Sequence, residues 1–298
     1  MKSLNNYGVF DLTPVEDHGG ILFKRDDKFM PFDDVPLSGG KVRQAITLIH
    51  DNYEHIKNEC NGTVATATSV HSPQGLIVAR TAKEFGFRSK IIIGATTDDK
   101  WQSNRLIRKC VEFGATIDYE SKFGYDSVLA KRLTVLNQTE RFFTIKFGIN
   151  LLDNPSAIIG SIGYQTQNIP DDLDVLVIPT GSGITAGGIL RGLIQYNIKP
   201  KRIIVHQIAG FDRTKTIGQV LAGHEIDFEY VADKTYSYSR KLKIQFNDVA
   251  YKFKDSTFRG EFLDPIYESK SFEWMHRNID TIGNRVLFWI VGNSLFVR

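Results

Sequence analysis

Residues 174–207 read DVLVIPTGSGITAGGILRGLIQYNIKPKRIIVHQ. The two ends of this stretch, Asp174–Pro179 and Arg202–Gln207, are apolar runs of strand length, and Ile189–Leu193 between them follow a helical pattern. A buried strand, a helix and a second buried strand in this order are typical of a βαβ unit, in which the two strands are parallel. The stretch therefore predicts an α/β fold.

The same alternation of helical patterns and strand-like runs continues through the first half of the chain. Gly86 and Gly114 each end a helical pattern and supply a left-handed cap. We expect two open, mostly parallel sheets covered by helices, in a large domain formed by 1–45 and 156–298 and a small α/β domain inserted at 46–155. The expected helices are Val42–Ile49, Gly75–Phe85 and Leu106–Val111, and the expected strands are Gly62–Thr68, Lys90–Gly94, Ala115–Tyr119 and Phe142–Phe147.

The composition is that of a globular protein without special segments. The chain has 298 residues and 42% hydrophobic residues, and no apolar run approaches the roughly 18–20 residues of a membrane helix. No signal-peptide stretch begins the chain, so we expect a cytoplasmic protein with no membrane partner. Two cysteines, Cys60 and Cys110, are too few for a disulfide framework or a cysteine-rich zinc site. The net charge of +3 is too small to indicate nucleic-acid binding by itself.

A glycine-rich turn follows the first strand of the quoted stretch. Its backbone N–H groups can converge on an anion, and the following helix adds its partial positive charge. The residues of the turn are Gly181, Ser182, Gly183, Ile184 and Thr185. The ordinary alternative is a tight turn whose glycines allow close packing. We expect a phosphate cradle.

Two well-known phosphate loops fit this turn poorly. A Walker loop ends in Gly-Lys-Ser/Thr, which is missing here. The dinucleotide pattern is formally met by Gly181, Gly183 and Ala186, but it also needs an acid at the end of the next strand, where this chain has Gln207. A dinucleotide site is therefore the weaker interpretation.

A lysine with an unusual position follows the stretch KRDD (24–27). Lys41 comes directly after Gly39 and Gly40, at the mouth of a predicted helix. A helix amino terminus disfavours a cation, which lowers the pKa of an ammonium group, and a lysine with a depressed pKa is what Schiff-base chemistry requires. An exposed first-turn lysine is the ordinary alternative.

Two polar segments complete the set of candidate motifs. Thr68–Gly75 (TSVHSPQG) is a turn between a strand and a helix, which a helix cap by Ser72 ahead of Pro73 also explains. Leu263–Ser271 (LDPIYESKS) by itself is a turn followed by a helix start. Neither segment indicates a particular chemistry alone.

Taken in order, these four segments resemble a known family. They look like the tryptophan-synthase-β-like (fold type II) pyridoxal-phosphate enzymes, nearest to the branch of 1-aminocyclopropane-1-carboxylate deaminase and D-cysteine desulfhydrase. The resemblance runs from about residue 20 to the end of the chain. KRDD with GGKVR and DPIYESKS are specific to that branch, whereas the glycine loop is shared across the superfamily.

The resemblance implies roles in holding pyridoxal 5'-phosphate. Lys41 matches the lysine that forms the Schiff base and later moves a proton at the substrate's α-carbon. The loop Gly181–Thr185 matches the phosphate site. Glu268 stands where the branch places a carboxylate against the pyridine nitrogen, which keeps the ring protonated and strengthens it as an electron sink.

It also implies residues on the substrate side. Ser69 matches a hydroxyl near the substrate carboxylate or α-proton, and Tyr267 matches an active-site tyrosine. Tyr238 is a second candidate tyrosine. The branch has Asn at position 70, where it bonds the cofactor's ring hydroxyl; this chain has Val70, and His71 is the neighbour most able to replace that contact.

Other departures from the branch also fall near the expected substrate. The expected His-Thr-Gly-Gly reads Ile-Val-Gly-Asn at 290–293, and the usual Asn before the lysine is Gly40. These changes agree with retained cofactor chemistry and an altered substrate.

The leading hypothesis is a pyridoxal-phosphate lyase acting at the α-carbon of an amino acid, as a cytoplasmic homodimer with its cofactor in the interdomain cleft. A second hypothesis is a decarboxylase of an amino acid, or of an amino acid joined to a modified nucleotide or DNA base. A third is a catalytically inactive binding protein with the cofactor fold.

Overall fold

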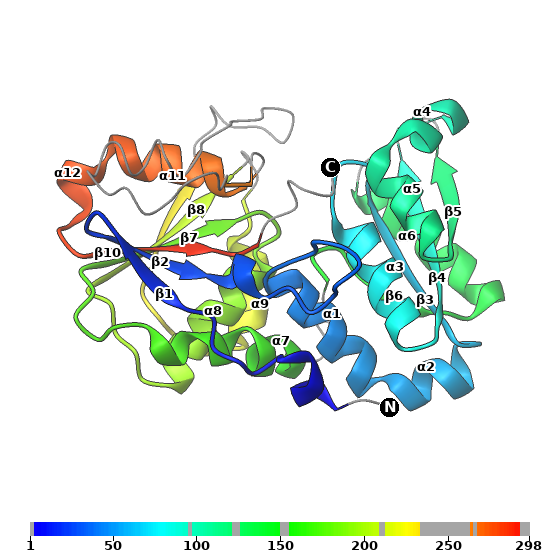
Figure 1. Ribbon diagram of the computed structural model, residues 1–298, viewed down its shortest axis with the longest axis horizontal. Coiled ribbons are helices and arrows are strands. Elements are labelled where there is room, and N and C mark those ends of the chain that lie inside the picture. The colour runs from blue at the N-terminus through cyan, green and yellow to red at the C-terminus, as the bar shows by residue number, and fades with distance from the viewer. Residues whose placement is uncertain are drawn as a thin grey trace. The chain divides into compact units, whose positions relative to one another are not determined.

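The computed structural model describes residues 3–94, 97–120, 126–149, 155–208, 212–232, 263–264 and 267–292. The chain separates into two compact units, one of Lys41–Ala157 with the N-terminal residues up to Val9, the other of Phe10–Gly40 and Ile158–Phe296. Each unit contains a mostly parallel sheet flanked by helices, which confirms the α/β class (Figure 1). The boundaries of the inserted domain at 46–155 stay a prediction. Within the described ranges, no helix has the length and apolar character to span a membrane.

The larger unit is built on a six-stranded sheet in the order β1-β2-β10-β7-β8-β9. Among the strands of this sheet that the structure describes, β1 alone runs antiparallel to its neighbour, and the other adjacent pairs are parallel. β10, from the end of the chain, lies between β2 and β7 and joins the two halves of the sheet. The strands are β1 Val15–His18, β2 Ile21–Arg25, β7 Val175–Thr180, β8 Arg202–Gln207, β9 Glu229–Ala232 and β10 Val286–Ile290.

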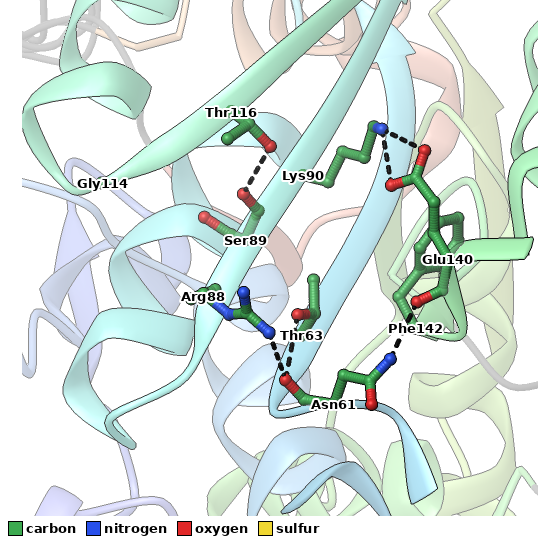
Figure 2. A pocket seen from close by; sticks show the side chains of 9 residues that line it. All are labelled: Asn61, Thr63, Arg88, Ser89, Lys90, Gly114, Thr116, Glu140 and Phe142. Carbon is green, nitrogen blue, oxygen red and sulfur yellow. Dashed lines mark hydrogen bonds and ion pairs between the residues drawn. The ribbon is translucent and has the colours of Figure 1, made fainter.

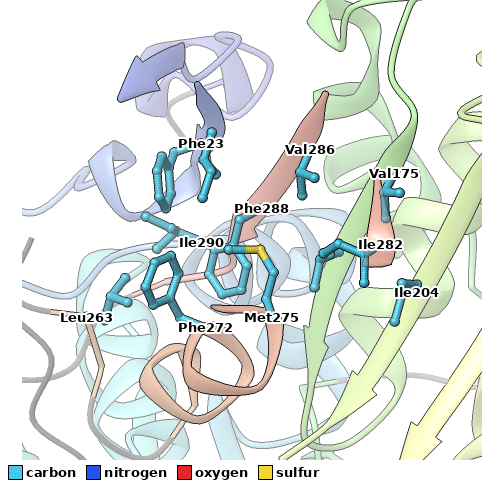
Figure 3. Packing of buried hydrophobic residues seen from close by; sticks show 12 residues of the cluster. Phe23, Val175, Ile204, Leu263, Phe272, Met275, Ile282, Val286, Phe288 and Ile290 are labelled. Carbon is cyan, nitrogen blue, oxygen red and sulfur yellow. The ribbon is translucent and has the colours of Figure 1, made fainter. Parts of the chain in front are cut away.

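One face of this sheet forms a hydrophobic core with α11 (Figure 3). Val175 and Val177 point to this face because alternate residues of a strand share a side, and Phe272 and Met275 of α11 pack on them. The ring of Phe272 stacks on Phe23 at a centroid distance of 6.0 Å. The helices of this unit are η2 Asp26–Lys28, α7 Ser156–Ser161, which spans the division between the units, η3 Gly163–Asn168, α8 Ile184–Gln195, α9 Thr214–Leu221, α11 Glu268–Arg277 and α12 Ile279–Ile282.

The glycines inside α8 serve close packing. A Cβ at Gly187 would lie 2.7 Å from the Cβ of Val220 on α9, and one at Gly192 would collide with the backbone of Gly163 in η3. For these two glycines the ordinary packing interpretation is therefore correct.

The other unit holds a four-stranded parallel sheet in the order β5-β4-β3-β6. Its core on one face packs residues of the sheet against Leu129 and Leu133 of α6, and α3 contacts β3, β4 and α5. The strands are β3 Thr63–Ser69, β4 Arg88–Gly94, β5 Ala115–Glu120 and β6 Phe143–Ile145; the helices are η1 Leu4–Tyr7, α1 Gly40–Asp51, α2 Tyr53–Glu59, α3 Gln74–Glu84, α4 Asp98–Ser103, α5 Arg105–Glu112 and α6 Asp126–Glu140.

The expected elements of both units are present. Gly86 and Gly114 have φ angles of +76° and +87°, so both act as the left-handed caps that the sequence predicts. The β1–β2 hairpin, β9 and β10 were not predicted from the sequence.

Candidate active site

The glycine loop lies at the carboxyl end of β7, as expected for a site in an α/β sheet. Gly183 has a φ of +87°, and a Cβ there would lie 3.2 Å from the Cβ of Arg213, so the position requires glycine. α8 begins at the next residue, Ile184, whose N–H donates to Ser182 Oγ at 3.4 Å. The first N–H groups of a helix lack partners within the helix, and the dipole favours an anion beside them. The loop can therefore hold a phosphate group.

The two glycines before Lys41 are fixed against this part of the sheet. Gly39 has a φ of +90°, and a Cβ there would collide with the carbonyl of Val291 just after β10. The N–H of Gly40 donates to that carbonyl at 2.9 Å, and a Cβ at Gly40 would lie 3.3 Å from Cγ2 of Thr185. Lys41 follows at once as the second residue of α1. Gly40, the last residue of the larger unit before Lys41, therefore lies beside the first turn of α8.

Glu268 is the first residue of α11 and is only 1% exposed. Within the described part of the chain, neither of its carboxylate oxygens has a hydrogen-bond partner. Burial raises the pKa of Glu268 well above its ordinary value, and the negative charges of Asp264 and Asp27 add to the rise; the backbone amides of Glu268 and Gly292 act in the opposite direction. An ordinary first-turn carboxylate would be solvated and charged. Glu268 is instead a buried carboxyl group that needs a partner.

The end of β10 brings these features together. Gly292 packs against Ser38 and Gly39, where a Cβ on it would lie 2.9 Å from the carbonyl of Ser38. The backbone amide of the same Gly292 lies near the carboxyl group of Glu268 and lowers its pKa. The glycine loop, the peptide before Lys41 and Glu268 therefore share one edge of the six-stranded sheet.

The KRDD stretch holds β2 and β10 in place from inside the protein. Lys24 Nζ, fully buried, donates to the carbonyl of Thr13 and to Asn168 Oδ1, each at 2.6 Å. Asp26 accepts from Thr13 Oγ1 at 2.8 Å and from the indole of Trp289 on β10 at 3.1 Å. The motif therefore positions the strand whose end approaches Gly39.

The turn after β3 lies in the other unit. Ser69 ends β3 and is half-buried; its Oγ accepts the N–H of His71 at 3.3 Å, and His71 is exposed. Ser72 Oγ accepts from the N–H of Gln74 at 3.3 Å, but α3 begins at Gln74, so Pro73 and not Ser72 is its capping residue. The carbonyl of Val70 accepts from Asn104 Nδ2 at 3.2 Å. The assignments of Ser69 and His71 to substrate and cofactor stay predictions.

Of the two candidate tyrosines, one is described. Tyr267 is half-buried and precedes α11, and its backbone N–H donates to Asp264 Oδ1 at 3.2 Å. Tyr238 lies outside the described residues.

A pocket of about 690 Å³ lies at the opposite, amino-terminal edge of the four-stranded sheet (Figure 2). Lys90 Nζ forms an ion pair with Glu140 Oε1 at 2.6 Å, and Arg88 donates to the backbone carbonyl of Asn61 at 2.6 Å. Ligands of open α/β sheets bind at the carboxyl ends of strands. No predicted site residue lines this pocket, and we do not assign it to the cofactor.

Comparison with known proteins agrees with this geometry. The model of the family described as pyridoxal-phosphate dependent enzymes matches residues 12–254. Over 93% of its own length and 79% of the relative's, the chain is 26% identical to an O-seryl-dTMP PLP-dependent decarboxylase of Salmonella phage ViI. It is 24% identical, over 85% and 77% of the two lengths, to a putative 1-aminocyclopropane-1-carboxylate deaminase of Pyrococcus furiosus.

Solved structures show the same fold. The crystal structure of a homologue of 1-aminocyclopropane-1-carboxylate deaminase superposes with a TM-score of 0.73 at 19% identity, covering 94% of this chain and 89% of that one. The processed form of threonine deaminase isoform 2 from Solanum lycopersicum gives a TM-score of 0.62 at 16% identity, covering 98% and 83%.

Proposed function

The chain belongs to the family of pyridoxal-phosphate dependent enzymes, and on that premise we propose that it decarboxylates an amino acid joined to a nucleotide. The similarity to the O-seryl-dTMP decarboxylase, which extends over 93% of the chain, carries the proposal. The departures from the deaminase branch support it, because the segment 290–293 replaces a His-Thr-Gly-Gly motif that the resemblance places near the substrate.

The residues of the larger unit fit the cofactor. The buried carboxyl group of Glu268 has no hydrogen-bond partner in the described chain, and a pyridine nitrogen is a partner that can share its proton. The loop at Gly183 offers helix-start N–H groups and a left-handed turn to a phosphate. We assign Gly181, Ser182, Gly183, Ile184 and Thr185 to the phosphate, Glu268 to the ring nitrogen and Lys41 to the aldehyde carbon.

When bound, the cofactor supplies an electron sink for the pair left at the α-carbon. Decarboxylation breaks the bond between the α-carbon and the carboxylate, releases CO₂ and leaves the α-carbon in need of a proton. Lys41 Nζ is the group we assign to deliver that proton. Glu268 holds the proton at the ring nitrogen, and Ser69 and Tyr267, with Tyr238, are assigned to the substrate.

The test compares two substrate classes on one enzyme preparation. O-seryl-dTMP is expected to yield CO₂ and an aminoethyl nucleotide with one carbon fewer, detected by mass spectrometry. 1-Aminocyclopropane-1-carboxylate and D-cysteine are expected to yield no ammonia. Ammonia from either small amino acid without CO₂ from the nucleotide would favour the deaminase hypothesis, for which the relative from Pyrococcus furiosus is the supporting observation.

We further propose a homodimer in the cytoplasm. Analytical ultracentrifugation of the purified protein tests the dimer, and cell fractionation tests the location. An enzyme that binds the cofactor but converts neither substrate class would favour the third hypothesis, an inactive binding protein.

A further inference from the structure

A backbone carbonyl of the glycine loop accepts a hydrogen bond from a residue of the neighbouring strand. Gln207, the fully buried last residue of β8, donates from Nε2 to the carbonyl of Gly181 at 3.3 Å. A trans peptide is planar, so the N–H of Ser182 points away from the carbonyl of Gly181. A bond to this carbonyl therefore also sets the direction of the N–H on the other side of the peptide.

The Gln207 amide is itself oriented by Tyr230 on the edge strand β9. The Tyr230 hydroxyl donates to Gln207 Oε1 at 3.2 Å. Because only the amide nitrogen can donate, this bond leaves Nε2 to face the loop. The same hydroxyl accepts the backbone N–H of Arg213 at 2.8 Å, which fixes its own direction.

The residue that binds Tyr230 also supports the loop directly. Arg213 precedes α9, and its Cβ and carbonyl oxygen lie 3.2 and 3.3 Å from where a Cβ of Gly183 would stand. Gln207 therefore reaches the loop at Gly181, and Arg213 reaches it at Gly183. Tyr230 links the two.

We infer that Gln207 and Tyr230 are positioning residues that hold the N–H groups of the glycine loop in the orientation that binds the cofactor's phosphate. The inference rests on the proposed assignment of this loop to the phosphate. The glycines of the loop have no side chains to fix their own peptides, and N–H groups that are already aligned bind an anion without the cost of ordering them. Loss of one such bond is expected to weaken phosphate binding about 3- to 10-fold.

The chemistry of position 207 agrees with this inference. In a dinucleotide fold this strand end carries an acid for the ribose. The amide of Gln207 can both donate to Gly181 and accept from Tyr230, which a carboxylate cannot do. It also adds no negative charge beside a phosphate.

The test titrates cofactor-free enzyme with pyridoxal phosphate and with pyridoxal, which lacks the phosphate, and measures both dissociation constants by absorbance. The variants are Tyr230→Phe, which keeps the ring on an edge strand, and Gln207→Met, which keeps the shape of the side chain. Tyr196→Phe is the matched control, because Tyr196 follows the end of α8 and its hydroxyl accepts a hydrogen bond from the exposed Gln195. Thermal melting by circular dichroism checks that each variant is folded.

We expect Tyr230→Phe and Gln207→Met to weaken the binding of pyridoxal phosphate about 3- to 10-fold and to leave the binding of pyridoxal unchanged. Tyr196→Phe should bind both ligands as the wild type does. A folded Tyr230→Phe that binds pyridoxal phosphate as wild type does, or that loses affinity for both ligands equally, would overturn the inference. Wild-type enzyme that binds both ligands equally would instead overturn the assignment of the loop to phosphate, and the inference with it.

Discussion

Glu268→Gln is expected to make the stability of the cofactor-free protein less dependent on pH. Burial raises the pKa of Glu268 well above its ordinary value of 4.5. A carboxyl group whose pKa is higher in the folded than in the unfolded chain binds more protons when folded, so the free energy of unfolding falls as pH rises from 4.5 to the folded value. Within that range the loss is about 1.4 kcal/mol for each pH unit.

Glutamine keeps the shape of the side chain and cannot ionise, so E268Q should lack this fall in stability. The assay is urea unfolding of the cofactor-free proteins at several values between about pH 5 and 8. The matched control is Glu273→Gln on the same helix, where Glu273 is ion-paired with Arg277 near the surface. The control should retain the pH dependence of the wild type.

The same substitution is expected to slow the reaction of the loaded enzyme. On our proposed assignment it removes the group that shares a proton with the ring nitrogen, and loss of one such stabilising contact typically lowers kcat about 10²-fold or more. Affinity for the cofactor should change little. If Glu268 were an ordinary first-turn carboxylate, it would gain about 0.3–1 kcal/mol from the helix dipole, and E268Q would cost only stability. A near-normal kcat for E268Q would refute the assignment of Glu268 to the ring nitrogen. A pH dependence of stability like that of the wild type would refute the claim that burial raises the pKa of Glu268.

The remaining predictions concern the lysine, the loop and the core. Lys41→Ala should abolish covalent attachment of the cofactor, measured by mass spectrometry after borohydride reduction; a cofactor linked to another lysine would contradict this. Gly183→Val should lower the cofactor's affinity and destabilise the fold by about 1–2 kcal/mol, because a β-branched residue is strained at a φ of +87°. Titration measures the affinity and thermal melting measures the stability, and an unchanged affinity would argue against the assignment of the loop to the phosphate. Phe272→Ala should destabilise the larger unit by about 3–5 kcal/mol in urea unfolding, because its ring is buried in the sheet core; a loss below 1 kcal/mol would show that it contributes little to that core.

The fold class could be predicted from the sequence because buried parallel strands leave a strong local pattern. Asp174–Pro179 and Arg202–Gln207 are apolar along their length, and the structure has strands at both. β10 was missed, although VLFWI at 286–290 is an equally apolar run. Its position between β2 and β7 could not be predicted, because these partners lie far away in sequence and strand order has no local signature.

The candidate site was predictable to the extent that motifs carry it. The positions of Lys41, the glycine loop and Glu268 came from matched segments, and the structure places the loop, the glycines before Lys41 and Glu268 at one sheet edge. The burial of Glu268 could not be predicted, because it depends on packing by distant segments. The contact of Gln207 with the loop was also missed, although an amide at the strand end where dinucleotide folds have an acid was the available signal.

Residues at one edge of the six-stranded sheet adopt backbone conformations and bury a carboxyl group in ways that lower the stability of the fold. Gly39 and Gly183 adopt left-handed backbone, and Glu268 is a buried carboxyl group with no hydrogen-bond partner in the described chain. The close approach of Gly292 to Gly39 requires glycine at both positions, and that approach places the amide of Gly292 near Glu268. Proteins retain such exceptions mainly where function needs them. On our proposed assignment, a ring nitrogen that shares the proton of Glu268 would remove the penalty of its burial, so the same contact would serve the chemistry and stabilise the loaded fold.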